Sequence, residues 1–172
     1  LIFSQNTVPE FLDLYIESIG SNYKSLLFTN NSLPLFNGCK QRDTSEFNKF
    51  LKAKNYKFEK KTKSHSYLIS KVKKFEIVLD ANDPPSDLNS KNYQAGCLSF
   101  EFLYGGKKVI SNCGSANNFS GELPYLSQTT AAHSTLAIND TSSCLFQKNS
   151  LVRTYYGNSL IQKLKVYKKD LN

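Results

Sequence analysis

Two adjacent glycines, Gly105 and Gly106, constrain the fold of this chain more than any other sequence feature. The runs on either side, residues 97–104 and 107–113, are rich in residues that β-strands favour. Two glycines in a two-residue loop supply the positive φ angles that type I′ and II′ turns require. The pattern therefore predicts a β-hairpin between residues 96 and 113.

The predicted hairpin has a definite register, in which Tyr104 faces Lys107. The same register pairs Phe102 with Val109, Phe100 with Ser111, and Leu98 with Cys113. We predict that the core face carries Leu98, Phe100, Phe102, Val109 and Cys113. The opposite face is a mixed set that suits a partly covered surface: Ser99, Glu101, Leu103, Lys108, Ile110 and Asn112.

A further strand is predicted over residues 129–140, because apolar and polar residues alternate there. Leu136 and Ile138 lie on one side of this strand and are expected to be buried. His133 lies on the other side, so it is predicted to point away from the apolar side.

Two helices are predicted before the strands. In the first, from Val8 to Ile19, apolar residues recur at helical spacing and Gly20 is placed to end the helix. In the second, Asp43 has Glu46 three residues later, which is the form of a capping box, and the helix continues to about Asn55.

Short β-type runs make up most of the remaining chain, with turn-rich loops between them. They fall at residues 66–70, 75–79, 144–148, 152–155 and 160–167, with a loop over residues 80–92. Strands at this frequency, with no helices between them, predict a mainly β fold. We expect an antiparallel β-sandwich preceded by one or two helices.

The net charge of +8 and the pI near 9.2 favour a polyanionic partner. The excess is nearly all lysine, since arginine occurs only at Arg42 and Arg153, so a simply solvated surface is the alternative. No nucleic-acid partner is predicted, because the basic residues do not fall into a recognisable nucleic-acid module. No membrane span is predicted either, because no apolar run has the length to cross a bilayer.

The four cysteines show no C-x-x-C spacing, which argues against a zinc knuckle or a redox pair. Cys97 and Cys113 project to opposite faces of the predicted hairpin, so a disulfide between them is disfavoured. We interpret all four as small apolar core thiols, including Cys39 and Cys144.

Several motifs carry a resemblance to a known family. They are Cys-Leu-Ser-Phe-Glu from Cys97, the Gly105-Gly106 pair, Asn-Cys-Gly from Asn112, and Thr-Ala-Ala-His-Ser-Thr-Leu from Thr130. In this order and spacing they resemble the β-sandwich part of the heparinase II/III family of polysaccharide lyases, in a form similar to alphaproteobacterial versions. The resemblance is strongest over residues 93–143, with support from residues 35–38 and 80–85.

The resemblance implies a domain organisation. A helical toroid precedes the sandwich in this family, so residues 1–55 would be the end of that toroid and its connection. Residues 56–172 would be the β-sandwich, truncated at its C-terminus. The chain has no methionine and opens in the apolar run Leu1-Ile2-Phe3, so we expect an internal piece of a longer protein. The residues themselves do not indicate a location, and the family implies a periplasmic one.

The resemblance also implies a function. The family cleaves acidic, uronate-containing polysaccharides by β-elimination, in which a base removes the proton α to the carboxylate while a neighbouring group neutralises that carboxylate. These roles belong largely to the helical part, so this piece would supply the β-sandwich wall of the cleft and be inactive alone. The alternative is a non-catalytic β-sandwich module that binds envelope glycans or a protein partner.

The resemblance points to His133 as the catalytic candidate, because a histidine of this strand faces the cleft in the family. In several members it is one of three metal ligands, and the positions matching the other two hold Gln94 and Asn112, here taken as substrate-binding. Amides are poor substitutes for imidazole or carboxylate, so we predict no zinc and no other cofactor. The alternative is a neutral hydrogen-bonded cluster of the three residues that holds strands together.

Other polar and aromatic residues have simpler explanations. Glu101 lies diagonal to Lys108 in the predicted register and is interpreted as half of a cross-strand ion pair. His65 is interpreted as an exposed strand residue. The tyrosines at strand ends could stack on sugars or lie at the edge of the core: Tyr93, Tyr104 and Tyr125.

Overall fold

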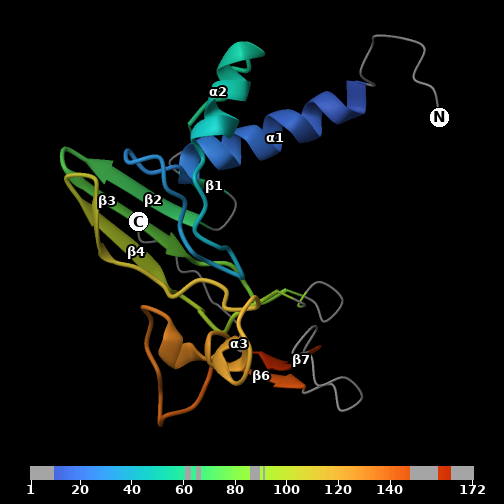
Figure 1. The fold of residues 1–172 in the computed structure, drawn as a ribbon, viewed down its shortest axis with the longest axis vertical. Helices are drawn as coiled ribbons and strands as arrows, with labels where there is room; N and C mark the ends of the chain where they lie inside the picture. The colour runs from blue at the N-terminus through green and yellow to red at the C-terminus, as the bar shows by residue number, and fades with distance from the viewer. Residues whose placement is uncertain are drawn as a thin grey trace, which may run out of the picture.

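A computed structural model describes residues 10–60, 63–64, 67–85, 90, 92–147 and 159–163 of the chain. Two helices come first, α1 (Glu10–Leu26) and α2 (Ser45–Ala53). A five-stranded antiparallel sheet follows, in the order β1 (Lys63–Ser64), β2 (Tyr67–Val72), β3 (Phe75–Asp80), β4 (Phe100–Tyr104) and β5 (Lys107–Ile110). Beyond one end of this sheet lie α3 (Leu123–Leu126) and a two-stranded sheet of β6 (Cys144–Gln147) and β7 (Ser159–Lys163) (Figure 1). The predicted mainly β, antiparallel class with leading helices is confirmed.

The predicted hairpin is present as β4 and β5, with a tight turn at the glycine pair. Gly105 and Gly106 have φ angles of 55° and 75°, which a type I′ turn requires and which glycine adopts without strain. Tyr104 pairs with Lys107 as expected, but an irregularity between Phe102 and Leu103 shifts the register beyond it.

The rest of the predicted register is wrong because of this shift. Phe102 pairs with Ile110 instead of Val109, and β5 ends there. The predicted pairs Phe100 with Ser111 and Leu98 with Cys113 therefore do not form.

The predicted core face of the hairpin is also wrong. Leu98 is 48% exposed, Val109 is 61% exposed and Cys113 is exposed, while Phe100 and Phe102 are only half-buried. The buried side chains lie on the other face and include Ser99, Glu101, Leu103 and Asn112. We call this the inner face of the sheet, and the face that carries Val109 the outer face.

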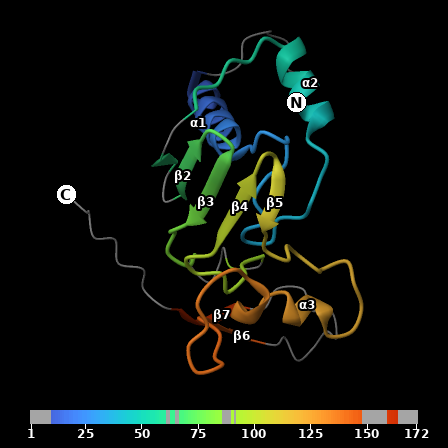
Figure 2. The same cartoon turned by 90° about the vertical axis from the view of Figure 1, so that its left-hand side faces the viewer.

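A segment from the N-terminal part of the chain explains this inversion. Residues 27–38, here called the covering segment, lie over the inner face and bring Phe28 and Phe36 into contact with Val78 and Leu103. Leu26, Tyr67 and Ile69 pack around this cluster. Burial therefore follows the position of the covering segment and not the apolar alternation of β4 and β5. Figure 2 shows the sheet with the N-terminal part of the chain passing beside it.

Polar side chains of the sheet and its loops hold the covering segment through hydrogen bonds. The Thr29 amide donates to Glu76 Oε2 at 3.0 Å and the Leu35 amide donates to Glu101 Oε1 at 2.9 Å. Further along, Asn37 Nδ2 donates to Asp80 Oδ2 at 2.7 Å and the Gly38 amide donates to Gln94 Oε1 at 3.0 Å. Side-chain oxygens of the sheet and its loops thus accept hydrogen bonds from N–H groups of the covering segment, which is not paired as a strand.

Helix α1 is longer than predicted. It passes through Gly20 and ends at Leu26, where Lys71 Nζ donates to the carbonyls of Ser25 at 3.1 Å and Leu27 at 2.7 Å. A cation at the last carbonyls of a helix stabilises its C-terminus. Gly20 is needed for packing instead, because a Cβ there would lie 2.3 Å from the Phe58 ring.

Helix α2 begins close to the predicted place. Thr44 precedes its first residue, whereas the capping-box pattern placed the cap at Asp43. The Asp43 carboxylate accepts from the Ser45 amide at 2.8 Å, and this bond is the main cause of the lowered pKa of Asp43. The cap therefore lies one residue later than expected.

The predicted strand over residues 129–140 is wrong. The structure has a 3-10 turn at Thr130–Ala132 and an isolated bridge between Ile138 and Thr141. Leu136 and Ile138, expected to be buried, are 78% and 60% exposed. The Thr130 hydroxyl donates to the Ala95 carbonyl at 2.7 Å, and side-chain bonds of this kind compete with strand pairing.

The other predicted strands compare well with the structure. β2 and β3 match the runs at 66–70 and 75–79, with Lys73 and Lys74 as their turn. β6 falls within the run at 144–148, and β7 overlaps the run at 160–167 but begins one residue earlier. The run at 152–155 and His65 lie outside the described residues. No helix in the described part of the chain is long and apolar enough to span a membrane. The division at residue 55 stays a prediction.

Candidate functional site

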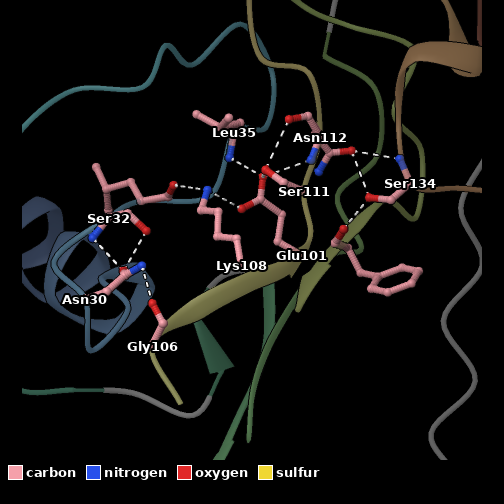
Figure 3. A network of polar contacts seen from close by, with 11 residues as sticks. Asn30, Ser32, Leu35, Glu101, Gly106, Lys108, Ser111, Asn112 and Ser134 are labelled. Carbon is pink, nitrogen blue, oxygen red and sulfur yellow. Dashed lines mark hydrogen bonds and ion pairs between the residues drawn. The ribbon is translucent and has the colours of Figure 1, made fainter. Parts of the chain in front are cut away.

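The buried carboxylate of Glu101 is the centre of a polar network that leads to the predicted site (Figure 3). Lys108 Nζ contacts Glu101 Oε2 at 2.7 Å, which is the ion pair that the sequence suggested. The backbone amides of Leu35 and Asn112 donate to Oε1 at 2.9 and 3.2 Å. A fully buried carboxylate requires such compensation, so the contacts of Glu101 are those of a residue that supports the structure.

Asn112 extends this network toward the 3-10 turn. Its side chain is 4% exposed, and Oδ1 accepts from the Ser134 amide at 2.9 Å and lies 3.1 Å from the Ser134 hydroxyl. That hydroxyl also donates to the Phe100 carbonyl. Asn112 thus joins the end of the hairpin to the residue that follows His133.

His133 is buried at the end of the 3-10 turn, with 9% of its surface exposed. Burial lowers its pKa, and a hydrogen bond to the Ser127 backbone opposes this shift. Because Nε2 has no partner, this bond comes from Nδ1. A neutral imidazole whose Nδ1 proton is held in this way presents a bare lone pair at Nε2.

The backbone of Gly96 lies against the His133 ring. A Cβ at Gly96 would be 3.3 Å from His133 Cγ and 3.1 Å from Ser99 Oγ. Such distances are tighter than ordinary van der Waals contact, so glycine at this position allows the imidazole to pack where it does.

Gln94 is almost fully buried and uses its whole amide. Nε2 donates to the carbonyls of Gly114 at 2.8 Å and Ser127 at 2.9 Å, and Oε1 accepts from the Gly38 amide at 3.0 Å. Gln94 and His133 therefore meet at the Ser127 carbonyl. The structure brings together the three residues that the sequence singled out, although His133 does so from a turn and not from a strand.

Two buried side-chain atoms in the described part of the chain have no hydrogen-bond partner, namely Asn112 Nδ2 and His133 Nε2. Asn112 accepts from the Ser134 amide, and His133 is the residue before Ser134 in the chain. An unpaired buried polar atom costs about 1–3 kcal/mol, so each of these two atoms requires a functional or structural explanation. Asn112 Nδ2 is a donor, and the bare lone pair of His133 Nε2 is an acceptor.

The residues present do not fit a zinc ion. Gln94 Oε1 already accepts from Gly38, and Asn112 Oδ1 already accepts from Ser134, which leaves His133 Nε2 as the single available donor of the trio. No group of three His, Cys, Asp or Glu side chains among the described residues could hold a metal ion. Zinc normally takes three or four protein ligands of these types.

The cysteines and tyrosines divide between core and surface. The four cysteines, all among the described residues, form no disulfide with one another. Cys144 is buried as predicted, but Cys39 and Cys113 are exposed, so their assignment to the core is wrong. Tyr93 packs in a small core cluster with Cys144, whereas Tyr104 is 49% exposed on the sheet. Tyr125 lines a cavity of about 510 Å³ that also includes Asp140 and Phe146.

A larger cavity of about 590 Å³, lined in part by Lys40, Arg42 and Asn118, lies beside the covering segment. Sequence reasoning missed it, because its residues come from separated polar stretches without a motif. Arg42, one of the two arginines, was the available signal.

A family model and two solved structures are similar to this chain, and all three are of heparinase type. A model of the family described as heparinase II/III-like, C-terminal, matches residues 45–165. The fold is similar to that of heparan sulfate lyase HepC from Pedobacter heparinus, with a TM-score of 0.59, 16% identity, and coverage of 81% of this chain and 27% of that one. It is also similar to a heparinase III gene product, with a TM-score of 0.55, 17% identity, and coverage of 83% and 27%.

The chain thus spans about a quarter of the length of these structures. At these identities the likeness establishes the fold. No curated protein matches the sequence.

Proposed function

The chain belongs to the heparinase II/III-like C-terminal family, and from this premise we propose that it is part of a polysaccharide lyase. In this proposal the complete protein cleaves uronate-containing polysaccharides by β-elimination, and the chain forms the β-sandwich wall of the cleft. The observation that carries the proposal is the family match over residues 45–165, which includes the whole Gln94, Asn112 and His133 cluster. The missing helical domain of the same protein would supply the other wall.

The chemistry of β-elimination gives the two unpaired atoms a use. Removing the proton next to the uronate carboxylate creates enolate charge, and a group that stabilises this charge lowers the barrier. Asn112 Nδ2 can donate to a carboxylate oxygen. His133 Nε2, with its lone pair available, can accept a proton or a hydrogen bond. Its lowered pKa favours this neutral role over that of a fixed positive charge near neutral pH.

Substitution of His133 in the complete protein tests the proposal. We expect His133→Ala to lower turnover about a hundredfold with little change in melting temperature, because the proposed role is in charge stabilisation or proton transfer. Turnover is followed by the ultraviolet absorbance of unsaturated uronate products. Gln94→Ala is the matched control, since it removes three hydrogen bonds of the same cluster and should mainly lower the melting temperature. Unchanged turnover in His133→Ala, or unfolding of this variant, would show that His133 has only a structural role at the end of the 3-10 turn.

A second candidate is a non-catalytic module that binds glycans or a protein partner. The observation that favours it is the burial of Asn112 Nδ2 and His133 Nε2, neither of which is open to solvent. The same assay separates the two candidates. The lyase proposal predicts unsaturated products from the complete protein and none from residues 1–172 alone. Saturable glycan binding with no product from the complete protein would favour the module.

A further inference from the structure

The larger cavity is a built feature of the fold. Gly38 has a φ of +83°, and a Cβ there would lie 2.4 Å from the Asn92 carbonyl oxygen. Gly114 has a φ of +70°, and a Cβ there would lie 3.0 Å from the Cys39 carbonyl oxygen, which accepts from the Ser115 amide at 3.0 Å. Two close backbone approaches thus join residues 38–42 to residues 92 and 114–118, so the cavity walls are held in place before any ligand arrives.

The lining of this cavity is positively charged and rich in amides. Lys40 and Arg42 provide two cations, and no carboxylate occurs among the described residues that line it. The four amide side chains are Gln41, Asn92, Asn117 and Asn118. Lys40 Nζ donates to Asn118 Oδ1 at 2.6 Å, which fixes both side chains. Partial desolvation raises the pKa of the Cys39 thiol, and the positive charge of Arg42 opposes this rise.

The chemistry of this lining selects a class of ligand. A guanidinium matches the two oxygens of a carboxylate or sulfate, and an ammonium adds a second charge-assisted bond. Amides donate to and accept from hydroxyl groups at once. A ligand that carries one oxyanion on a polyhydroxylated frame would use both kinds of group. The smaller cavity, lined by Asp140 and with no Lys or Arg among its described lining residues, lacks this character.

We propose that the cavity between residues 38–42 and 115–118 is a binding site for an acidic sugar unit, with Arg42 and Lys40 on its oxyanion and the amides on its hydroxyl groups. The oxyanion is a carboxylate or a sulfate. The inference rests on the proposed function in taking the ligand to be a unit of the same polysaccharide. The site itself is separate, because its lining includes none of Gln94, Asn112 and His133.

Cys39 allows a direct test, because it lines the cavity and is an exposed residue. The complete protein is alkylated with iodoacetamide, and mass spectrometry gives the rate at each cysteine. Cys113, which is exposed and does not line the cavity, is the internal reference. Three tetrasaccharides are added in turn: heparosan, which has carboxylates alone, heparin, which also has sulfates, and maltotetraose, which is neutral.

We expect an anionic tetrasaccharide to slow alkylation of Cys39 and not of Cys113. Protection by heparosan identifies a carboxylate site, and protection by heparin alone identifies a sulfate site. The Arg42→Gln and Lys40→Gln variants should each need about tenfold more tetrasaccharide for half-protection, since each loses a charge-assisted bond. Lys107→Gln, which removes an exposed positive charge elsewhere, should behave as the unaltered protein.

Equal protection by maltotetraose, equal protection of Cys113, or protection unchanged in both variants would overturn the inference. Absence of protection with all three tetrasaccharides would overturn it as well. The result is independent of turnover. If His133→Ala abolishes product formation but no tetrasaccharide protects Cys39, the proposed lyase function stands and this binding site is ruled out. If Cys39 shows Arg42-dependent protection but the complete protein forms no product, the binding site stands and the proposed lyase function is ruled out.

Discussion

The two faces of the five-stranded sheet differ in burial and in polarity, and the buried face is the one that carries charged side chains, although buried faces are usually apolar. The inner face is buried and carries charged side chains, among them Glu76 and Glu101. The outer face carries apolar side chains that are about half exposed, including Val72, Phe75 and Val109. The difference teaches that the covering segment decides which face is buried. Its unpaired backbone donors require acceptors, and the carboxylates of the inner face provide them.

Aromatic contacts reinforce the charged inner face. The ring of Phe28 lies 5.7 Å from Lys71 Nζ and 5.8 Å from Lys108 Nζ, so two lysines contact one buried ring. Such contacts contribute about 0.5–2 kcal/mol each. The inner face is therefore a mixed core in which charges are compensated by carbonyls, carboxylates and a ring.

The largest expected effect comes from removing the central carboxylate of the inner face. Glu101→Ala leaves Lys108 and the Leu35 and Asn112 amides without their acceptor, so the free energy of unfolding should fall by about 3–5 kcal/mol. Urea unfolding measures this change. Glu101→Gln, which keeps the shape and one acceptor oxygen, should lose less. A loss below about 1 kcal/mol in Glu101→Ala, the size typical of exposed ion pairs, would show that the inner face is not buried as described.

A matched pair of apolar truncations compares the two faces directly. Leu103 on the inner face has no exposed surface, so Leu103→Ala should lower the free energy of unfolding by about 2–5 kcal/mol. Val109 on the outer face is 61% exposed, so Val109→Ala should change it by no more than about 0.5 kcal/mol. Equal losses in the two variants would mean that the outer face is also covered.

A smaller effect concerns pH. Burial, aided by the Asp80 charge, raises the pKa of Tyr67 on the inner face to about 12, above the value of about 10 in an unfolded chain. The stability linked to this phenol is fully present below pH about 10 and is lost as the pH rises toward 12. Tyr67→Phe should make the stability fall less steeply across this range. Tyr93, whose pKa burial also raises, accounts for part of the remaining fall. An unchanged slope in Tyr67→Phe would contradict the burial of Tyr67.

The sequence predicted β2 to β5, the hairpin turn and the antiparallel class, because these depend on local patterns such as Gly105-Gly106. It did not predict which face of β4 is buried, because that depends on contacts between residues far apart in the chain, such as Leu35 with Glu101. For the site, the family resemblance pointed to Gln94, Asn112 and His133, which belong to one hydrogen-bonded region of the structure and whose roles stay a proposal. The strand around His133 was wrong because the hydroxyl of Thr130 bonds to the backbone in place of strand pairing.

Hydrogen exchange at the Leu35 amide tests the docking of the covering segment most directly. This amide belongs to no strand, and its partner is the buried Glu101 carboxylate at 2.9 Å. We predict that it exchanges as slowly as the amides of β3 and β4, and that Glu101→Ala speeds its exchange before that of the sheet amides. Fast exchange at Leu35 in the unaltered protein, with the sheet amides still protected, would show that the segment does not cover the inner face.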